Sequence, residues 1–240
     1  MSLTVYKKKR SFQKTPEPKG APQKSSAQGL HFVVQKHDAS RLHYDFRLEM
    51  EGVLKSWAVP KGPSLNPDDK RLAMMVEDHP YDYRSFEGII PPGNYGAGTV
   101  IVWDEGVYEP LEPAAETGEQ EKILLKQLEA GDLKIVLKGK KLKGAYALVQ
   151  MKGRGENAWL LIKKKDRYAS TTDVTKKTKS VQSGKTIEQI KSASQQQGSH
   201  KDLSSEQTKR TSPAKTNSSG KKSTVVRKRR TPSKGAVKKG

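Results

Sequence analysis

Apolar and polar residues alternate strictly along the stretch Leu42–Met50. A period of two is typical of a β-strand with two unlike faces. The five apolar residues fall on one face, which we expect to pack into a core. The other face carries His43, Asp45, Arg47 and Glu49. One interpretation is an ordinary amphipathic strand whose polar face meets water. The other is a site that holds a divalent metal beside a phosphate.

Further short strands are expected on both sides of this one. The Glu51-Gly52 pair predicts the turn of a hairpin that joins residues 41–50 to the next strand. Residues 116–130 are the one clear helical stretch, and Gly131 is a typical stop. Short strands with few helices favour a mainly β fold, a compact closed barrel with short flanking helices. The other predicted strands are 31–35, 53–59, 72–77, 99–104, 133–137, 144–151 and 158–164.

The charged residues divide the chain of 240 residues into three parts. Residues 1–28 carry seven Lys or Arg and one acidic residue. Residues 29–168 carry 21 basic and 21 acidic residues, and residues 169–240 carry 18 basic and four acidic residues. The net charge of +20 therefore lies in the two flanking segments. We expect a basic, extended N-terminal arm that contributes to the site, a globular domain, and a disordered Lys/Ser/Thr-rich tail. The arm is either free or anchored on the domain by Tyr6 and Phe12.

The composition narrows the partner and the compartment. Basic segments around a neutral domain favour a nucleic acid over a membrane, because the tail has no long apolar face to insert. No apolar run of about 18 residues predicts a membrane-spanning helix, and no apolar region near the N-terminus predicts a secretory signal. The chain has no cysteine, which excludes disulfides, thiolate metal sites and a Cys nucleophile. We expect a cytoplasmic, nucleoid-associated monomer with no membrane contact.

The glycine-rich segment 93–98 has two interpretations. Its three glycines resemble a phosphate-binding loop only weakly, because no helix follows and the Lys and Ser/Thr of such a loop are missing. A tight turn between two strands is the favoured interpretation.

Two imidazoles and a carboxylate form a candidate set of metal ligands. Of the five histidines, His37 and His43 lie close to Asp45 in the sequence. On one strand face, His43 and Asp45 are about 7 Å apart along the strand, so their side chains can converge on one ion. His37 is expected to fold back from the loop before this strand. Three protein ligands leave coordination positions open for water and substrate, as a catalytic metal requires.

Arg47 continues the same row one step beyond these ligands. A fixed guanidinium at this place can hold two phosphate oxygens at once. The alternative is an ion pair in solvent with Glu49 or Glu51.

His79 and Tyr83 are further candidates. Pro80 forces His79 into an extended conformation at the end of a predicted strand. The two side chains would supply hydrogen bonds or a proton if that strand lies beside Leu42–Met50. The alternative is a surface turn capped by Asp82.

Six stretches and one further residue carry a family resemblance: 32–37, 41–48, 54–64, 77–83, 93–104, 159–163 and Asp166. Together and in this order they resemble the 3′-phosphoesterase domain of bacterial and archaeal DNA ligase D. The likeness covers roughly residues 5–168.

The resemblance implies a site in the barrel that depends on Mn²⁺, with other divalent transition metals as alternatives. It implies two steps at DNA 3′ ends: a phosphodiesterase step removes a terminal ribonucleoside, and a phosphomonoesterase step then removes the 3′-phosphate to leave a 3′-OH. The partners would be DNA or RNA-tipped DNA 3′ ends, and a separate DNA ligase or end-joining factors. No Lys-x-Asp-Gly nucleotidyl-transfer motif occurs, so we expect a stand-alone phosphoesterase. The alternative is a catalytically inactive DNA-binding accessory protein of end joining.

Position by position, the resemblance implies that the metal ligands are His37, His43 and Asp45, and that the phosphate-contacting and catalytic residues are Arg47, His79 and Tyr83. It implies that activity also needs two residues of the arm, Arg10 and Glu17. The supporting basic positions would be Lys61 and Arg71. The residues that would contact the substrate are Arg10, Arg47, Lys61 and Arg71. His79 would either donate a proton or offer a hydrogen bond in the transition state. Ser11 departs from the family pattern, in which an acid follows the Arg.

Overall fold

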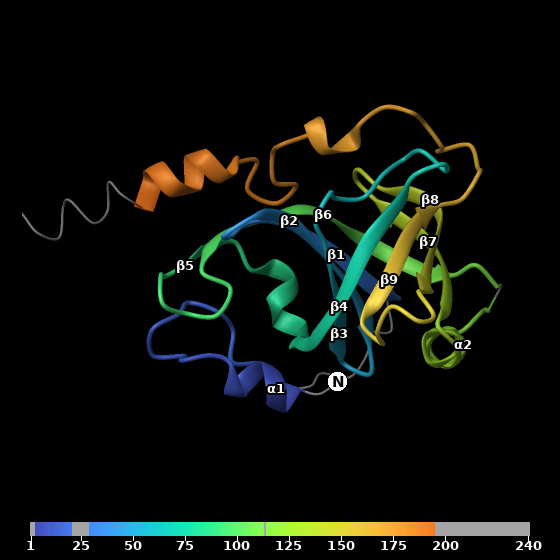
Figure 1. The fold of residues 1–240 in the computed structure, drawn as a ribbon, viewed down its shortest axis with the longest axis horizontal. Helices are drawn as coiled ribbons and strands as arrows, with labels where there is room; N and C mark the ends of the chain where they lie inside the picture. Colours follow the sequence, from blue (N-terminus) through green and yellow to red (C-terminus); the bar gives the residue numbers. More distant parts are fainter. Residues whose placement is uncertain (1–2, 21–28, 113, 195–240) are drawn as a thin grey trace, which may run out of the picture. The chain divides into compact units, whose positions relative to one another are not determined.

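Eight antiparallel strands close into a barrel, as Figure 1 shows. The computed structural model describes residues 3–20, 29–112 and 114–194. Around the ring the order is β1 (Leu30–Asp38), β2 (Leu42–Met50), β3 (Val53–Val59), β4 (Lys70–Pro80), β9 (Ala158–Lys163), β8 (Lys143–Gln150), β7 (Asp132–Gly139) and β6 (Gly98–Pro110), which pairs again with β1. The short strand β5 (Gly88–Ile90) pairs with the start of β6. The predicted mainly β class and closed barrel are confirmed.

Alternate side chains along each strand fill the barrel interior. β2 places four of its five apolar side chains there, in one cluster with Trp57, Trp103 and Tyr146. The exception is Leu42, which was expected in the core but is 46% exposed at the first position of the strand. Apart from this end effect, the alternation predicted which side of β2 faces the core.

The opposite side of the barrel wall is also covered. Asp45, Arg47 and Glu49 on β2 are all buried, so the interpretation of a polar face in water is wrong. A second apolar cluster lies on this outer side, and it joins residues of the arm, β1, β3, β6 and the segment after β4. Its members are Tyr6, Val33, Leu54, Tyr83, Phe86, Ile90, Val100 and Val102.

The N-terminal arm supplies part of this cover. It was expected to be extended, but it begins with the helix α1 (Leu3–Lys8). Tyr6 of α1 is fully buried, and its hydroxyl donates to the Pro18 carbonyl oxygen at 2.6 Å. Phe12 packs against the same cluster. Of the two alternatives for the arm, the anchored one therefore holds for residues 3–20, while residues 21–28 lie outside the described ranges.

The position of His37 differs from the prediction. His37 lies in β1, which continues to Asp38, so residues 39–41 alone join the two strands. It stands directly opposite His43 in the register. Directly opposite residues on one sheet face have their Cβ atoms about 5 Å apart. The hairpin thus brings the two imidazoles together without any folding back of a loop.

The predicted helix is confirmed as α2 (Thr117–Ala130). Gly131 ends it in the left-handed conformation with φ +73°, which glycine adopts without steric cost. Leu124 is the buried residue that α2 contributes to the barrel core. No helix in the described ranges is long and apolar enough to cross a membrane.

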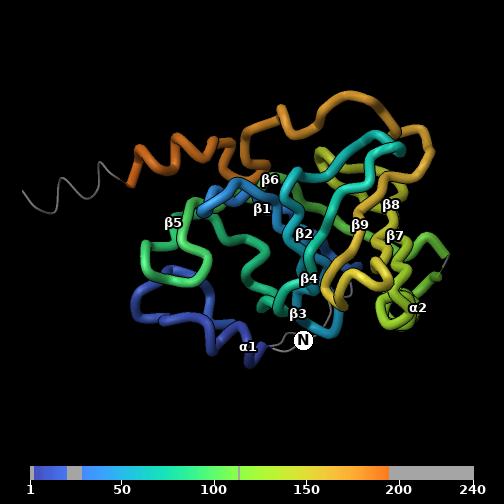
Figure 2. The backbone as a smooth tube through the Cα atoms, viewed as in Figure 1, coloured from blue at the N-terminus to red at the C-terminus, as the bar shows by residue number. Residues whose placement is uncertain are grey.

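The predicted start of the disordered tail at residue 169 is wrong. Val174, in the 3₁₀ helix η2 (Val174–Lys176), is 1% exposed and belongs to the barrel core. Further on, the Val181 N–H donates to the Val102 carbonyl oxygen at 2.9 Å. Figures 1 and 2 show residues 169–194, in orange, running along the edge of the barrel away from α2. The rest of the predicted tail lies outside the described residues.

We expect Val174→Ala to destabilise the fold by roughly 1.5–3 kcal/mol, because it removes two buried methyl groups and leaves a small cavity. Urea unfolding monitored by tryptophan fluorescence would measure the change. Thr171→Ala, at an exposed position three residues away, is the control and should stay within about 0.5 kcal/mol of the wild type. Equal stability of the two variants would show that residues 169–176 do not belong to the folded unit.

Candidate active site

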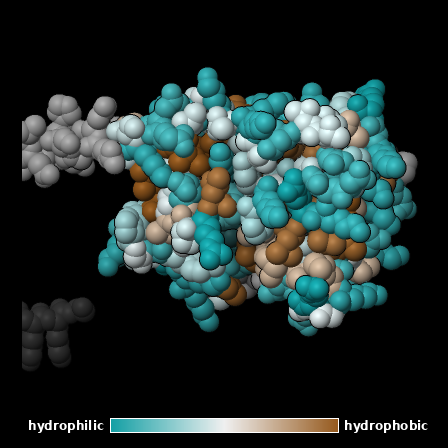
Figure 3. Space-filling model, turned by 45° about the horizontal axis from the view of Figure 1, so that its top comes forward, coloured by the Kyte–Doolittle hydropathy of each residue, from teal (hydrophilic) through white to brown (hydrophobic). Residues whose placement is uncertain are grey.

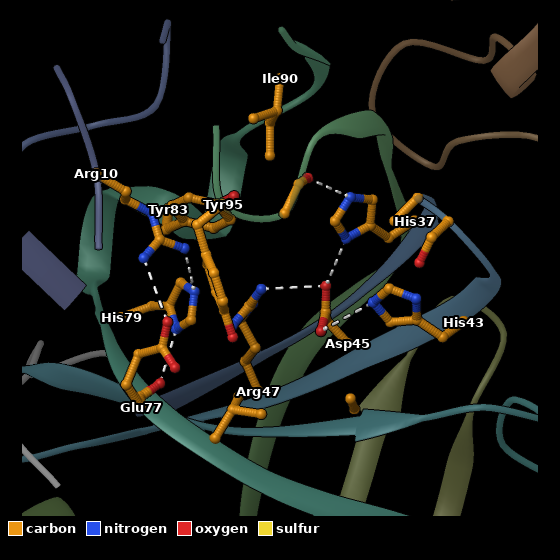
Figure 4. Close-up of a pocket in the computed structure, with 15 residues that line it drawn as sticks. Arg10, His37, His43, Asp45, Arg47, Glu77, His79, Tyr83, Ile90 and Tyr95 are labelled. Atoms are coloured by element: carbon orange, nitrogen blue, oxygen red, sulfur yellow. Dashed lines mark hydrogen bonds and ion pairs between the residues drawn. The ribbon is translucent and has the colours of Figure 1, made fainter. Parts of the chain in front are cut away.

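A cavity of about 250 Å³ opens on the outer side of the barrel wall. Its lining comes from β1 to β4, the arm, the segment after β4 and the loop before β6, as Figure 4 shows. The resemblance implied a site in the barrel. The cavity lies outside the barrel instead, because the residues that line it from β2 alternate with those that fill the interior. The charged and polar members of the lining are Arg10, Ser40, His37, His43, Asp45, Arg47, Glu77, His79, Tyr83 and Tyr95.

His37, His43 and Asp45 come together on one side of this cavity. One ligand atom from each residue lies within 4.8 Å of the other two. The imidazole rings of His37 and His43 have their centroids 4.7 Å apart. The structure therefore brings the three predicted metal ligands into one cluster.

Backbone carbonyl groups fix how the two imidazoles present their nitrogens. The His37 Nε2–H donates to the Gly96 oxygen at 2.9 Å, and the His43 Nδ1–H donates to the Arg41 oxygen at 2.9 Å. A carbonyl oxygen only accepts, so the other nitrogen of each ring carries the free lone pair. Those nitrogens face Asp45, with His37 Nδ1 3.4 Å from Oδ2 and His43 Nε2 3.7 Å from Oδ1. Two lone pairs and a carboxylate that converge in this way fit a cation.

Asp45 is held in its ionised form. Burial alone would raise the pKa of this carboxyl group, but the adjacent Arg47 guanidinium is the main opposing effect, and the pKa stays below its usual range. A carboxylate in this state is ready to bind a metal without first losing a proton.

Arg47 lies between the ligand cluster and the arm, as Figure 4 shows. Its Nε donates to Gln35 Oε1 at 2.8 Å, and its Nη1 donates to Ser56 Oγ at 2.9 Å. Its Nη2 lies 3.3 Å from Asp45 Oδ2. The alternative of a solvent ion pair with Glu49 or Glu51 is wrong, because the guanidinium is buried and its acidic partner is Asp45.

Arg10 is the residue of the N-terminal arm that lines the cavity. Its Nε donates to Glu17 Oε1 at 2.8 Å and its Nη1 to Glu77 Oε1 at 3.3 Å, while its Nη2 lies 3.2 Å from His79 Nε2. The guanidinium also stacks 3.8 Å from the ring centre of Tyr6. These contacts tie residues that are far apart in the sequence into one buried network.

Tyr83 belongs to the same network. Its hydroxyl donates to Glu17 Oε1 at 2.9 Å. Burial, and then the negative charge of Glu17, raise the pKa of Tyr83 well above its usual value. Tyr83 and His79 are both buried, so the alternative of a surface turn capped by Asp82 is wrong.

His79 is neutral in this setting. Its Nδ1–H donates to the Glu77 carbonyl oxygen at 2.9 Å, so Nε2 accepts from Arg10. Burial lowers the pKa of His79 well below its usual value, and the charges of Arg47 and Arg10 lower it further. A neutral imidazole with Nδ1 already engaged has no proton on Nε2 to give.

Lys61 and Arg71 are not part of this cavity. They line a separate hollow of about 330 Å³ together with Pro60, Lys70 and Leu72. Arg71 Nη2 lies 2.8 Å from Asp69 Oδ2, which also lines this hollow. The structure thus brings the two predicted basic positions together, but apart from the ligand cluster.

Glu77 and Tyr95 were missed as members of the site. Glu77 Oε2 lies 3.0 Å from Lys9 Nζ, and its other oxygen accepts from Arg10. The Lys9 ammonium also lies 4.5 Å from the ring centre of Tyr95. Tyr95 belongs to the glycine-rich segment 93–98, which is a turn before β6, as favoured.

A β-bulge explains why the alternation did not reveal Glu77. Leu54 of β3 pairs with His79, and Ser56 pairs with Val76, so two steps on β3 meet three steps on β4. The extra residue on β4 turns Glu77 and His79 toward the cavity that Val76 also lines. A strict period of two would place Val76 and Glu77 on opposite faces.

Comparison with known proteins gives a consistent result. Residues 35–150 match the family model described as the DNA ligase D 3′-phosphoesterase domain. The multifunctional non-homologous end joining protein LigD of Pseudomonas aeruginosa is 53% identical over 173 residues, which are 71% of this chain and 19% of that protein. The protein of the same name from Mycolicibacterium smegmatis is 41% identical over 165 residues, which are 69% of this chain and 21% of that protein. The chain thus spans about a fifth of the length of these relatives.

We expect His79 to make the fold less stable in acid. Its pKa in the folded chain lies well below the ordinary value of 6.5, so the unfolded chain binds this proton at a higher pH. The contribution of neutral His79 to the free energy of unfolding is therefore complete above about pH 6.5. Below this pH the free energy of unfolding falls, by up to about 1.4 kcal/mol per pH unit. Urea unfolding at pH 7.5, 6.5 and 5.5 should show a shallower pH dependence in His79→Gln than in the wild type. An NMR titration with a His79 pKa of 6.5 or above would contradict this expectation.

Proposed function

The chain belongs to the DNA ligase D 3′-phosphoesterase family through residues 35–150, and from this premise we propose that it is a hydrolase that processes DNA 3′ ends. A phosphodiesterase step removes a 3′-terminal ribonucleoside. A phosphomonoesterase step then removes the 3′-phosphate and leaves a 3′-OH for ligation. The reaction serves non-homologous end joining, as the names of the relatives state for those proteins. A separate DNA ligase or end-joining factors would complete the repair.

The single observation that carries this proposal is the cluster of His37, His43 and Asp45 beside the buried guanidinium of Arg47. Two imidazole lone pairs and one carboxylate fit a divalent transition metal, and Mn²⁺ is the ion that the family resemblance implies. When bound, such an ion supplies Lewis-acid polarisation of a phosphoryl oxygen and lowers the pKa of a water molecule.

Arg47 binds and orients the phosphate in this proposal. Two hydrogen bonds and an ion pair fix the guanidinium plane before any substrate arrives. A cation that needs no reorganisation stabilises negative charge in the transition state more effectively than a mobile one. Arg10 adds a second fixed positive charge next to His79.

His79 acts by hydrogen bonding rather than as a resident acid. The neutral ring offers the Nε2 lone pair, and both neighbouring guanidinium groups oppose its protonation. It can therefore accept a hydrogen bond from a protonated phosphate oxygen or keep Arg10 in place. Of the two alternatives for His79, the hydrogen-bonding one is supported.

The second candidate function is a DNA-binding accessory protein without catalysis. The basic segments of the sequence favour it, since they supply binding that depends on salt and not on sequence. The intact ligand cluster and its fixed tautomers argue against it. Mn²⁺-dependent trimming of a primer that ends in one ribonucleotide separates the two, because an accessory protein yields no product at any metal concentration.

We expect Asp45→Asn to reduce both steps at least about 100-fold, because the variant keeps the shape of the side chain but loses the charged ligand. The measurement uses primers that end in a ribonucleotide or a 3′-phosphate. Calorimetric titration with Mn²⁺ gives a readout that does not depend on activity, and Asp45→Asn should weaken this binding as well.

Asp132→Asn is the matched control. Asp132 carries a half-exposed carboxylate in an ion pair with Lys134 on β7, and it does not line the cavity. Its activity and Mn²⁺ affinity should equal those of the wild type. Near-normal activity of Asp45→Asn would overturn the metal assignment.

A further inference from the structure

The outer face of β4 and β9 is apolar and open to solvent. Leu72 and Met74 of β4 are 43% and 36% exposed. Leu160 and Ile162 of β9 are partly exposed beside them, since Leu72 pairs with Leu160 and Lys70 with Ile162. We call these four residues the apolar shelf. Figure 3 shows hydrophobic side chains at the surface, grouped between hydrophilic ones. Contiguous apolar groups at a surface are typical of interaction sites.

The apolar shelf begins where the candidate active site ends. Across the barrel wall, Asp45 pairs with Ala58 of β3, and Ala58 pairs with Met74. Ala58 and Val76 both line the cavity. The side chain between Asp45 and Met74 is therefore a single methyl group. The cavity thus opens over Ala58 toward Met74, and the shelf is continuous with the ligand cluster.

Positive charges stand at both ends of the apolar shelf. Lys70 and Lys164 are exposed at one end. At the other end the loop between β8 and β9 carries the exposed Lys152 and Arg154, and its Asn157 oxygen accepts from the Met75 N–H at 2.7 Å. None of these four cations has an ion-pair partner within the described ranges. An apolar strip with free cations at its ends matches the sugars, base edges and phosphates of a nucleic acid better than an apolar protein surface.

We propose that the apolar shelf carries the DNA strand that leads into the active site. The sugars and base edges of the nucleotides next to the 3′ end pack on Met74 and Leu72, and the phosphates beyond them lie near Lys70. From Val76 to Lys70 the protein strand β4 is about 20 Å long. At about 3.4 Å per nucleotide of one DNA strand, this length accommodates roughly six nucleotides. This inference rests on the proposed function, because it takes the 3′ end to lie at the ligand cluster.

Leu72→Glu tests the apolar shelf, because it places a negative charge where the DNA strand would lie. A fluorescent primer–template with a 3′-phosphate serves as the probe, and anisotropy gives its Kd. We expect Leu72→Glu to raise the Kd at least tenfold. The matched control is Leu111→Glu, since Leu111 is also 43% exposed but follows β6 away from the shelf. This control should stay within twofold of the wild type.

Lys70→Gln provides a second test that leaves the apolar residues intact. It should lower the slope of log Kd against log salt by about one, as expected for the loss of one phosphate contact. Equal effects of Leu72→Glu and Leu111→Glu, or an unchanged salt slope in Lys70→Gln, would overturn the proposal. So would a wild-type chain that binds no DNA, or a dimer that Leu72→Glu dissociates in size-exclusion chromatography. A wild-type chain that binds DNA in the expected pattern but hydrolyses neither end would refute the proposed function and still support the shelf.

Discussion

Asp45 carries a buried negative charge, and much of the outer barrel wall follows from the need to balance it. Arg47 supplies the nearest compensation, and Gln35 and Ser56 hold that guanidinium in place. The imidazoles of His37 and His43 turn lone pairs, rather than protons, toward the same carboxylate. Acceptors that face one another in a buried site are unfavourable unless a cation lies between them. The local hydrogen bonds thus suit the proposed metal at a cost to the metal-free fold.

The position of the N-terminal arm over the outer face of β2 follows from the same need to balance and shield buried charge. Arg47 can be shielded from water only if something covers the outer face of β2, and Tyr83 and the arm provide that cover. The arm brings Arg10 with it, and a second buried guanidinium needs its own acids, which are Glu17 and Glu77. Removing one partner of such a buried pair typically costs about 3–5 kcal/mol. The arm therefore stabilises the site as well as lining it.

The sequence allowed some of these features to be predicted and not others, for reasons that lie in distance along the chain. The alternation in β2 revealed its core face and two of the candidate metal ligands, because both depend only on the period of a strand. The bulge in β4 broke that period, so Glu77 escaped notice. The burial of Val174 depends on contacts with distant strands, which composition does not reveal. The roles of Arg10 and Glu17 came only through the family resemblance, since nothing in the arm's own pattern indicates a partner in β4.

The charges of the site explain how substrate, metal and protein would fit together. Among the described residues of the site, ion pairs join the cations Arg10, Arg47 and the more exposed Lys9 to the carboxylates of Asp45, Glu17 and Glu77. These six formal charges cancel, and His79 stays neutral. A divalent metal would leave the site with two positive charges in surroundings of low dielectric, which is unfavourable until an anion arrives. A terminal phosphate with two negative charges restores the balance fully, whereas a phosphodiester with one restores it by half. In the proposed reaction the same site would therefore bind both substrates and would hold the terminal phosphate more strongly, which would favour completion of the second step once the first has occurred.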